Sequence, residues 1–124
     1  MTNERKFDIY DRAFKFAVRS AQFIKALEKN IIVIEYSKQL IRSSASIGAN
    51  LEEADGALSR KDFVNKIGIA RREARESHHW VRLIQAVANF TEKSHKEEAG
   101  WLLNESKEIM LILSSIINKT KGVN

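Results

Sequence analysis

A small set of carboxylates and histidines has the spacing that a metal or acid–base site on a helix would need. Glu73 and Glu76 are three residues apart, and Glu76 and His79 repeat that interval, so one side of a helix would carry them. A di-iron bundle needs Glu-x-x-His on two helices together with further inward carboxylates. No second helix supplies the motif, because His95 stands alone beside a predicted turn. His78 and His79 point about 100° apart on one helix, so they cannot easily share one ion. We therefore predict no metal site and no cofactor.

Other arrangements typical of enzymes are also missing from the sequence. Ser43 and Ser44 have no histidine at a motif spacing, and the chain has no cysteine to act as a nucleophile. The five glycines are scattered singly, so they form no glycine-rich phosphate loop. Nothing assembles into a nucleophile, a base and an oxyanion donor. We predict that the protein is not an enzyme.

A row of basic residues is the feature most suggestive of a function. Its members fall within about 60° on one predicted helix. The row consists of Arg71, Arg75, His78 and Arg82, with Arg60 and Lys61 at the helix start. Lys and Arg number 21 against 16 for Asp and Glu, a net charge of +5, which favours polyanionic partners. We predict that Arg71, Arg75, Arg82 and Lys61 contact nucleic-acid phosphates without reading sequence.

The alternative for this row is an ordinary solvated polar face. No aromatic side chain is interleaved with the arginines. Base stacking of the kind that single-strand-binding proteins use therefore has no support.

The elements that would position these residues are four helices in one domain, residues 1–124. Proline is absent and glycine is sparse, which favours long uninterrupted helices over strands. Apolar spacing of three and four residues predicts helices over 5–29, 32–55, 60–90 and 95–120. Short connections between long helices make neighbours antiparallel, so the predicted fold is an all-α, up-down-up-down four-helix bundle.

Helix ends and core faces follow from the same pattern. Gly56 is predicted to cap the second helix, and capping boxes at 59–62 and 94–97 to open the third and fourth. The first core stripe is expected at Phe7, Tyr10, Phe14, Ala17, Ala21 and Ile24. The second is expected at Val33, Ser37, Leu40, Ser44, Ile47, Leu51 and Ala54.

The first helix carries a second apolar stripe. Ile9, Phe16 and Phe23 recur every seven residues, away from the expected core stripe, and burying each phenylalanine is worth about 1.5–3 kcal/mol. Trp80, with Leu83 and Val87, similarly flanks the third core stripe. We interpret these residues as a subunit interface; the alternative is a wider core that absorbs them within one subunit.

The sequence indicates no membrane segment. The longest apolar run, Ile31–Ile34, is four residues, far below the roughly 20 that cross a bilayer. The first residues run into an amphipathic stretch, so we expect no secretory signal. We predict a cytoplasmic protein.

Two segments resemble a known family. They are QLIRSSASIGANLEEA over 39–54 and KDFVNKIGIARREARE over 61–76, the latter followed by Trp80 and Leu83. Together they are similar to the four-helix-bundle proteins related to the 23S ribosomal RNA intervening-sequence protein. The resemblance covers the second and third predicted helices closely and the others by length and pattern only.

This resemblance implies an assembly and partners. It implies a cyclic, barrel-like homopentamer, in some members encoded within intervening sequences of ribosomal RNA genes. A related branch serves as accessory protein to the reverse transcriptase of diversity-generating retroelements, where a basic surface binds polymerase and nucleic acid. Our prediction is a homo-oligomer that contacts RNA, DNA or a nucleoprotein. The alternative is a protein-interaction scaffold that pairs with a polymerase or another protein.

The residues that carry the resemblance also have a structural interpretation. Arg42 and Glu53 lie on one face of the second helix, and Glu73, Glu76 and Trp80 lie at one edge of the third. We predict an arginine–glutamate network between these faces, within or between subunits, because an arginine fork binds a carboxylate with two hydrogen bonds. Asn50 would need a partner if buried.

Overall fold

Four long helices make up the part of the chain that the structure describes. The structure is a computed structural model that describes residues 4–122, with side chains from residue 9 onward. The helices are α1 (Glu4–Ala26), α2 (Ile31–Asp55), α3 (Arg60–Val87) and α4 (Lys93–Lys121). Their bounds lie within three residues of those expected, and residues 4–122 contain no strand.

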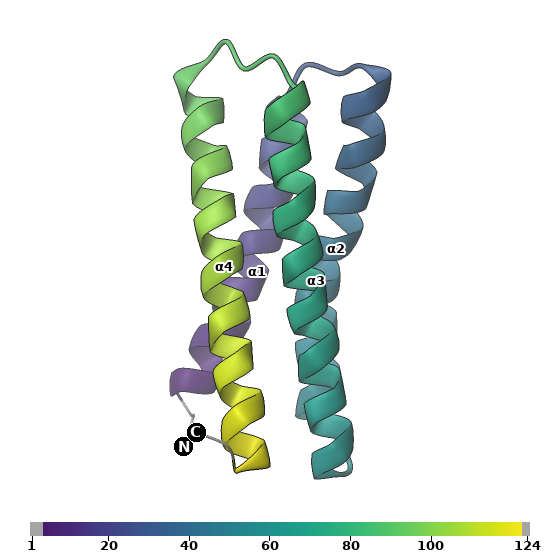
Figure 1. Cartoon of the computed structure of the whole chain (residues 1–124), viewed down its shortest axis with the longest axis vertical. Helices are drawn as coiled ribbons and strands as arrows, with labels where there is room; N and C mark the ends of the chain where they lie inside the picture. Colours follow the sequence, from purple (N-terminus) through teal and green to yellow (C-terminus); the bar gives the residue numbers. More distant parts are fainter. Residues whose placement is uncertain (1–3, 123–124) are drawn as a thin grey trace.

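The helices pack side by side as a bundle with alternating directions (Figure 1). The α1–α2 and α3–α4 connections lie at one end, and the α2–α3 connection lies at the other. Helix α1 packs against α2 and α4, and α3 packs against the same two helices. The order around the bundle is therefore α1, α2, α3, α4, so the α1/α2 side is opposite the α3/α4 side. The predicted all-α four-helix fold is confirmed.

Side-chain caps define two of the helix starts. Asn30 Oδ1 accepts from Val33 N at 2.9 Å at the start of α2, and Ser59 Oγ accepts from Asp62 N at 3.0 Å at the start of α3. Gly56 closes α2, where its N–H bonds back to the last turn. The predictions for Ser59 and Gly56 are confirmed, whereas Asn30 was overlooked.

The expected capping box at the start of α4 is wrong. The helix begins at Lys93, one residue before Ser94, and Glu92 is the N-cap without a side-chain cap bond. Ser94 Oγ lies 3.5 Å from Glu92 Oε1. Ser94 is already inside the first turn, so it cannot cap the helix from outside.

The core of α2 follows the expected stripe, since all seven of its predicted core residues are buried. Serines form a polar layer within this core. Ser43 Oγ on α2 and Ser77 Oγ on α3 lie 2.8 Å apart, which satisfies two hydroxyls that burial has removed from water.

The expected core face of α1 is right in part: Ile24 is buried and Tyr10 packs against the core. It is wrong for Phe14, which is 70% exposed, whereas Phe16 and Phe23 are 0% and 2% exposed and Ile9 is also buried. Helix α1 is thus turned so that the supposed interface stripe fills the core, and Phe16 and Phe23 cannot contact another subunit. Phe7 lies outside the described side chains.

Within the described helices, none is long and apolar enough to cross a membrane.

Candidate nucleic-acid interface

Helix α3 turns two of its carboxylates toward α2. Arg42 Nη1 of α2 donates to Glu73 Oε1 at 3.2 Å, and Arg42 Nη2 donates to Glu76 Oε1 at 2.8 Å. The Glu73 side chain is 9% exposed and that of Arg42 is 49% exposed. One half-exposed guanidinium therefore neutralises a nearly buried carboxylate and an accessible one, within a single chain.

Helix α4 turns two of its carboxylates toward α1. Arg12 donates to both oxygens of Glu105 at 2.8 Å, and Arg19 donates to both oxygens of Glu98 at 2.8 and 2.6 Å. The Arg19 guanidinium also lies 3.5 Å from the ring centroid of Trp101. These two bidentate pairs align α1 with α4.

The ion pairs lie at the α2/α3 and α1/α4 contacts, and basic side chains of α3 remain near its contact with α4. Arg71 Nη1 donates to Ser114 Oγ of α4 at 3.1 Å, so Arg71 lies across the junction between these helices. Arg75 and Arg82 are exposed and follow Arg71 and His78 by four residues each, and Lys61 is exposed near the start of the helix. The structure thus places Arg71, Arg75 and Arg82 along one edge of α3, with Lys61 at its exposed beginning.

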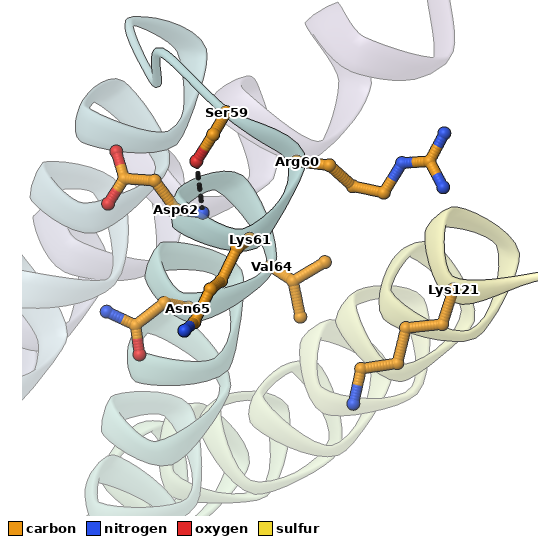
Figure 2. A pocket seen from close by; sticks show the side chains of 7 residues that line it. All are labelled: Ser59, Arg60, Lys61, Asp62, Val64, Asn65 and Lys121. Atoms are coloured by element: carbon orange, nitrogen blue, oxygen red, sulfur yellow. Dashed lines mark hydrogen bonds between the residues drawn. The ribbon is translucent and has the colours of Figure 1, made fainter.

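A hollow of about 890 Å³ marks the start of this edge, between the first turn of α3 and the end of α4. Figure 2 shows Arg60 of α3 and Lys121 of α4 extending on the same side of Val64, whereas Asp62 points away from them. A smaller hollow of about 290 Å³ shares Val64 and Lys121 and reaches Arg71. Cations from two helices, Arg60 and Arg71 of α3 and Lys121 of α4, thus line two hollows that share Val64 and Lys121.

His78 does not belong to the exposed row, contrary to the sequence interpretation. Its Nδ1 lies 3.2 Å from Leu103 O and 3.0 Å from Ser106 Oγ, both on α4. Burial lowers the pKa of His78 despite the bond to the Leu103 carbonyl, and the charges of Lys107 and Arg82 lower it further. His78 is therefore a neutral contact between helices at neutral pH.

The remaining predicted polar residues have local partners. Glu53 lies 3.9 Å from Lys66 Nζ and not against Arg42, and Asn50 Nδ2 donates to Ser46 O at 2.9 Å.

Trp80 is half-buried between α2 and α3. Its ring centroid is 5.8 Å from that of Tyr36 and 5.2 Å from that of His79. Its buried Nε1 has no hydrogen-bond partner among the described residues. The described residues also contain no group of three or more His, Asp or Glu that could hold a metal ion.

Sequence reasoning missed the pairing of α1 with α4 and the cations of α4. A signal for the pairing was present: Arg12 and Arg19 are seven residues apart, and so are Glu98 and Glu105. In antiparallel helices, equal intervals of opposite charge bring both pairs into register. Lys107 and Lys121 are fourteen residues apart, and only the packing of α4 on α3 places them at this edge.

The chain resembles proteins of one family. A family model described as 23S rRNA-intervening sequence protein matches residues 5–115. A crystal structure of a protein with unknown function, from the S23 ribosomal protein family of Bacteroides thetaiotaomicron, is 37% identical in sequence. It superposes with a TM-score of 0.74 and covers 88% of this chain and 97% of its own. No functionally curated protein matches the chain.

Replacing Arg42 by alanine tests the contact between α2 and α3. Arg42→Ala strands the nearly buried Glu73 carboxylate, so we expect the free energy of unfolding to fall by about 1–2 kcal/mol. Chemical denaturation measures it. Arg72→Ala, an exposed arginine on α3, is the matched control and should change stability by less than about 0.5 kcal/mol. Equal losses in both variants would show that the network contributes nothing specific.

The environment of His78 predicts a pH dependence of stability. The folded protein binds this proton less readily than the unfolded chain, so stability should fall as the pH drops below 6.5, the ordinary histidine value. Denaturation between about pH 7.5 and about pH 5 measures the effect. We expect His78→Gln to reduce the loss and His79→Gln, at the exposed neighbour, to leave it unchanged. An unchanged loss in His78→Gln would contradict this assignment.

Proposed function

The chain belongs to the 23S rRNA-intervening sequence protein family, and from that premise we propose a cytoplasmic, non-catalytic homo-oligomer that binds RNA or DNA through the basic edge of α3. The observation that carries the proposal is the separation of charge on α3. Glu73 and Glu76 face Arg42 of α2, while Arg75 and Arg82 are exposed beside α4.

This separation suits phosphate binding for a physical reason. A cation already paired with a carboxylate must lose that partner before it binds a phosphate. Arg42 is paired in this way, whereas Arg75 and Arg82 form no ion pair with any of the described residues. Each phosphate that such cations neutralise releases condensed counterions. The resulting affinity is electrostatic and independent of base sequence.

An apolar surface across α1 and α2 supports the oligomer. Phe14 and Val18 of α1 are 70% and 38% exposed, and Ile34 and Ile41 of α2 are 40% and 50% exposed. Phe14 follows Tyr10 by one helical turn, and Tyr10 donates to Leu51 O of α2 at 2.7 Å, so this side of α1 turns toward α2. We propose that these four residues, here named the α1/α2 apolar face, form the subunit contact in place of Phe16 and Phe23.

The same face supports a second candidate function. A polymerase or another protein that covers the α1/α2 apolar face would make the chain a scaffold or an accessory subunit, without direct contact to nucleic acid. This is the reverse-transcriptase accessory type that the sequence resemblance implies. The two functions differ in whether the purified protein binds nucleic acid.

Sedimentation equilibrium tests the assembly. We expect a mass several times 14.2 kDa, with five subunits as the family resemblance implies. A Phe14→Ser, Ile41→Ser variant should dissociate, because about 1.5–3 kcal/mol is lost for each large apolar side chain no longer buried. Lys15→Ser, Lys25→Ser, at exposed positions of α1, should remain assembled. A monomeric wild-type protein would refute the assembly.

Replacing three arginines tests nucleic-acid binding. We expect Arg71→Gln, Arg75→Gln, Arg82→Gln to weaken binding to all sequences alike and to make the salt slope shallower by about 2.7 for duplex DNA, about 0.9 for each phosphate. Fluorescence anisotropy at several salt concentrations measures both, and circular dichroism verifies that helicity is retained. If the wild-type protein binds no nucleic acid at low salt, the scaffold function replaces this proposal.

A further inference from the structure

Helix α4 adds Lys121 to both hollows beside α3, and it carries a second lysine, Lys107, directly after Ser106, which contacts His78 of α3. We infer that Lys107 and Lys121 act with Arg60, Arg71 and Arg82 as one groove for the phosphate backbone of a double-stranded nucleic acid. This inference rests on the proposed function and adds both the residues of α4 and the class of ligand. The basic row on α3 does not include the lysines of α4, and the family description does not name a double-stranded ligand.

Polar groups of α3 and α4 lie close together at three levels along the two helices. At the first level, near the start of α3, Arg60 and Lys121 extend on the same side of Val64 (Figure 2). In the middle, Arg71 Nη1 donates to Ser114 Oγ at 3.1 Å.

At the upper level, His78 bonds to Leu103 O and Ser106 Oγ of α4. Lys107 of α4 and Arg82 of α3 both act on the charge of this histidine. Lys107 directly follows Ser106 on α4, and Arg82 lies one helical turn after His78 on α3, so each helix carries a cation close to this contact.

The length of the groove suits a rigid ligand. Arg60 and Arg82 are 22 residues apart, or about 33 Å along a helix that rises 1.5 Å per residue. A duplex strand advances about 3.4 Å per phosphate, so the groove spans about ten base pairs. A straight duplex presents phosphates to all three levels without bending, whereas a flexible single strand would have to be ordered.

The aromatic side chains that the structure describes do not favour stacking on bases in this groove. None of them lines either hollow. Trp80 packs on Tyr36 on the α2 side of α3, and Trp101 lies beneath Arg19 on the α1 side of α4. Proteins that prefer single strands depend on such stacking. A groove that offers only charge favours the ligand with the denser phosphates, which is the duplex.

The test compares ligands and variants in one titration series. The ligands are an RNA duplex and a DNA duplex of about 20 base pairs, twice the groove length, and their separate strands. Binding is measured by fluorescence anisotropy between about 50 and about 200 mM salt. The groove variant is Lys107→Gln, Lys121→Gln. The control is Lys15→Gln, Lys25→Gln, which removes the same charge from exposed positions of α1.

We expect duplexes to bind more tightly than their strands, and the groove variant to have a salt slope shallower by about two than the control. Equal affinity for RNA and DNA duplexes supports recognition of phosphates alone, and a preference for one of them identifies the natural source. Strands that bind as tightly as duplexes overturn the inference but leave the proposed function intact. Identical slopes for the groove and control variants overturn the role of α4. Absence of binding to every ligand overturns both proposals.

Discussion

Apolar burial and arginine–glutamate pairing together set how the helices are rotated about their axes, and the surfaces of the molecule follow from that rotation. Helix α1 has two apolar stripes, and the buried one carries Ile9, Phe16 and Phe23, where the other has Ala17 and Ala21 beside Phe14. Hydrophobic burial therefore favours the observed rotation, and each partly exposed ion pair adds about 0–1 kcal/mol. With Phe16 inside, Arg12 and Arg19 reach Glu105 and Glu98 with two hydrogen bonds each.

The same pairing determines where positive charge remains. Four glutamates, Glu73, Glu76, Glu98 and Glu105, face arginines across the α2/α3 and α1/α4 contacts. With those carboxylates engaged elsewhere, they do not neutralise Arg75 and Arg82 of α3, which are exposed. The basic surface is thus a consequence of internal pairing as much as of composition.

The sequence predicted the residues whose burial or capping role depends only on their neighbours along the chain. Helix α2 has a single apolar stripe, and Ser59 and Gly56 have caps defined by neighbours in the chain, so periodicity and local chemistry were sufficient. Helix α1 offered two stripes with helical spacing, and spacing alone cannot choose between them, although the buried stripe carries the larger apolar side chains. The α4 side of the groove could not be predicted either, because Lys107 and Lys121 join Arg71 only through the packing of one helix on another.

Opposite placement of the two surfaces gives the proposed assembly a physical advantage. The α1/α2 apolar face lies across the bundle from the α3/α4 groove, so subunits that associate through the former leave the latter open. Each groove alone would bind weakly, since exposed cations gain little from each phosphate in water. Subunits joined in one assembly present further grooves at high effective concentration once the first is bound, which can raise overall affinity by 10²–10⁴ without any new contact. In the proposed assembly, a helical bundle would in this way hold a nucleic acid through many weak and identical contacts.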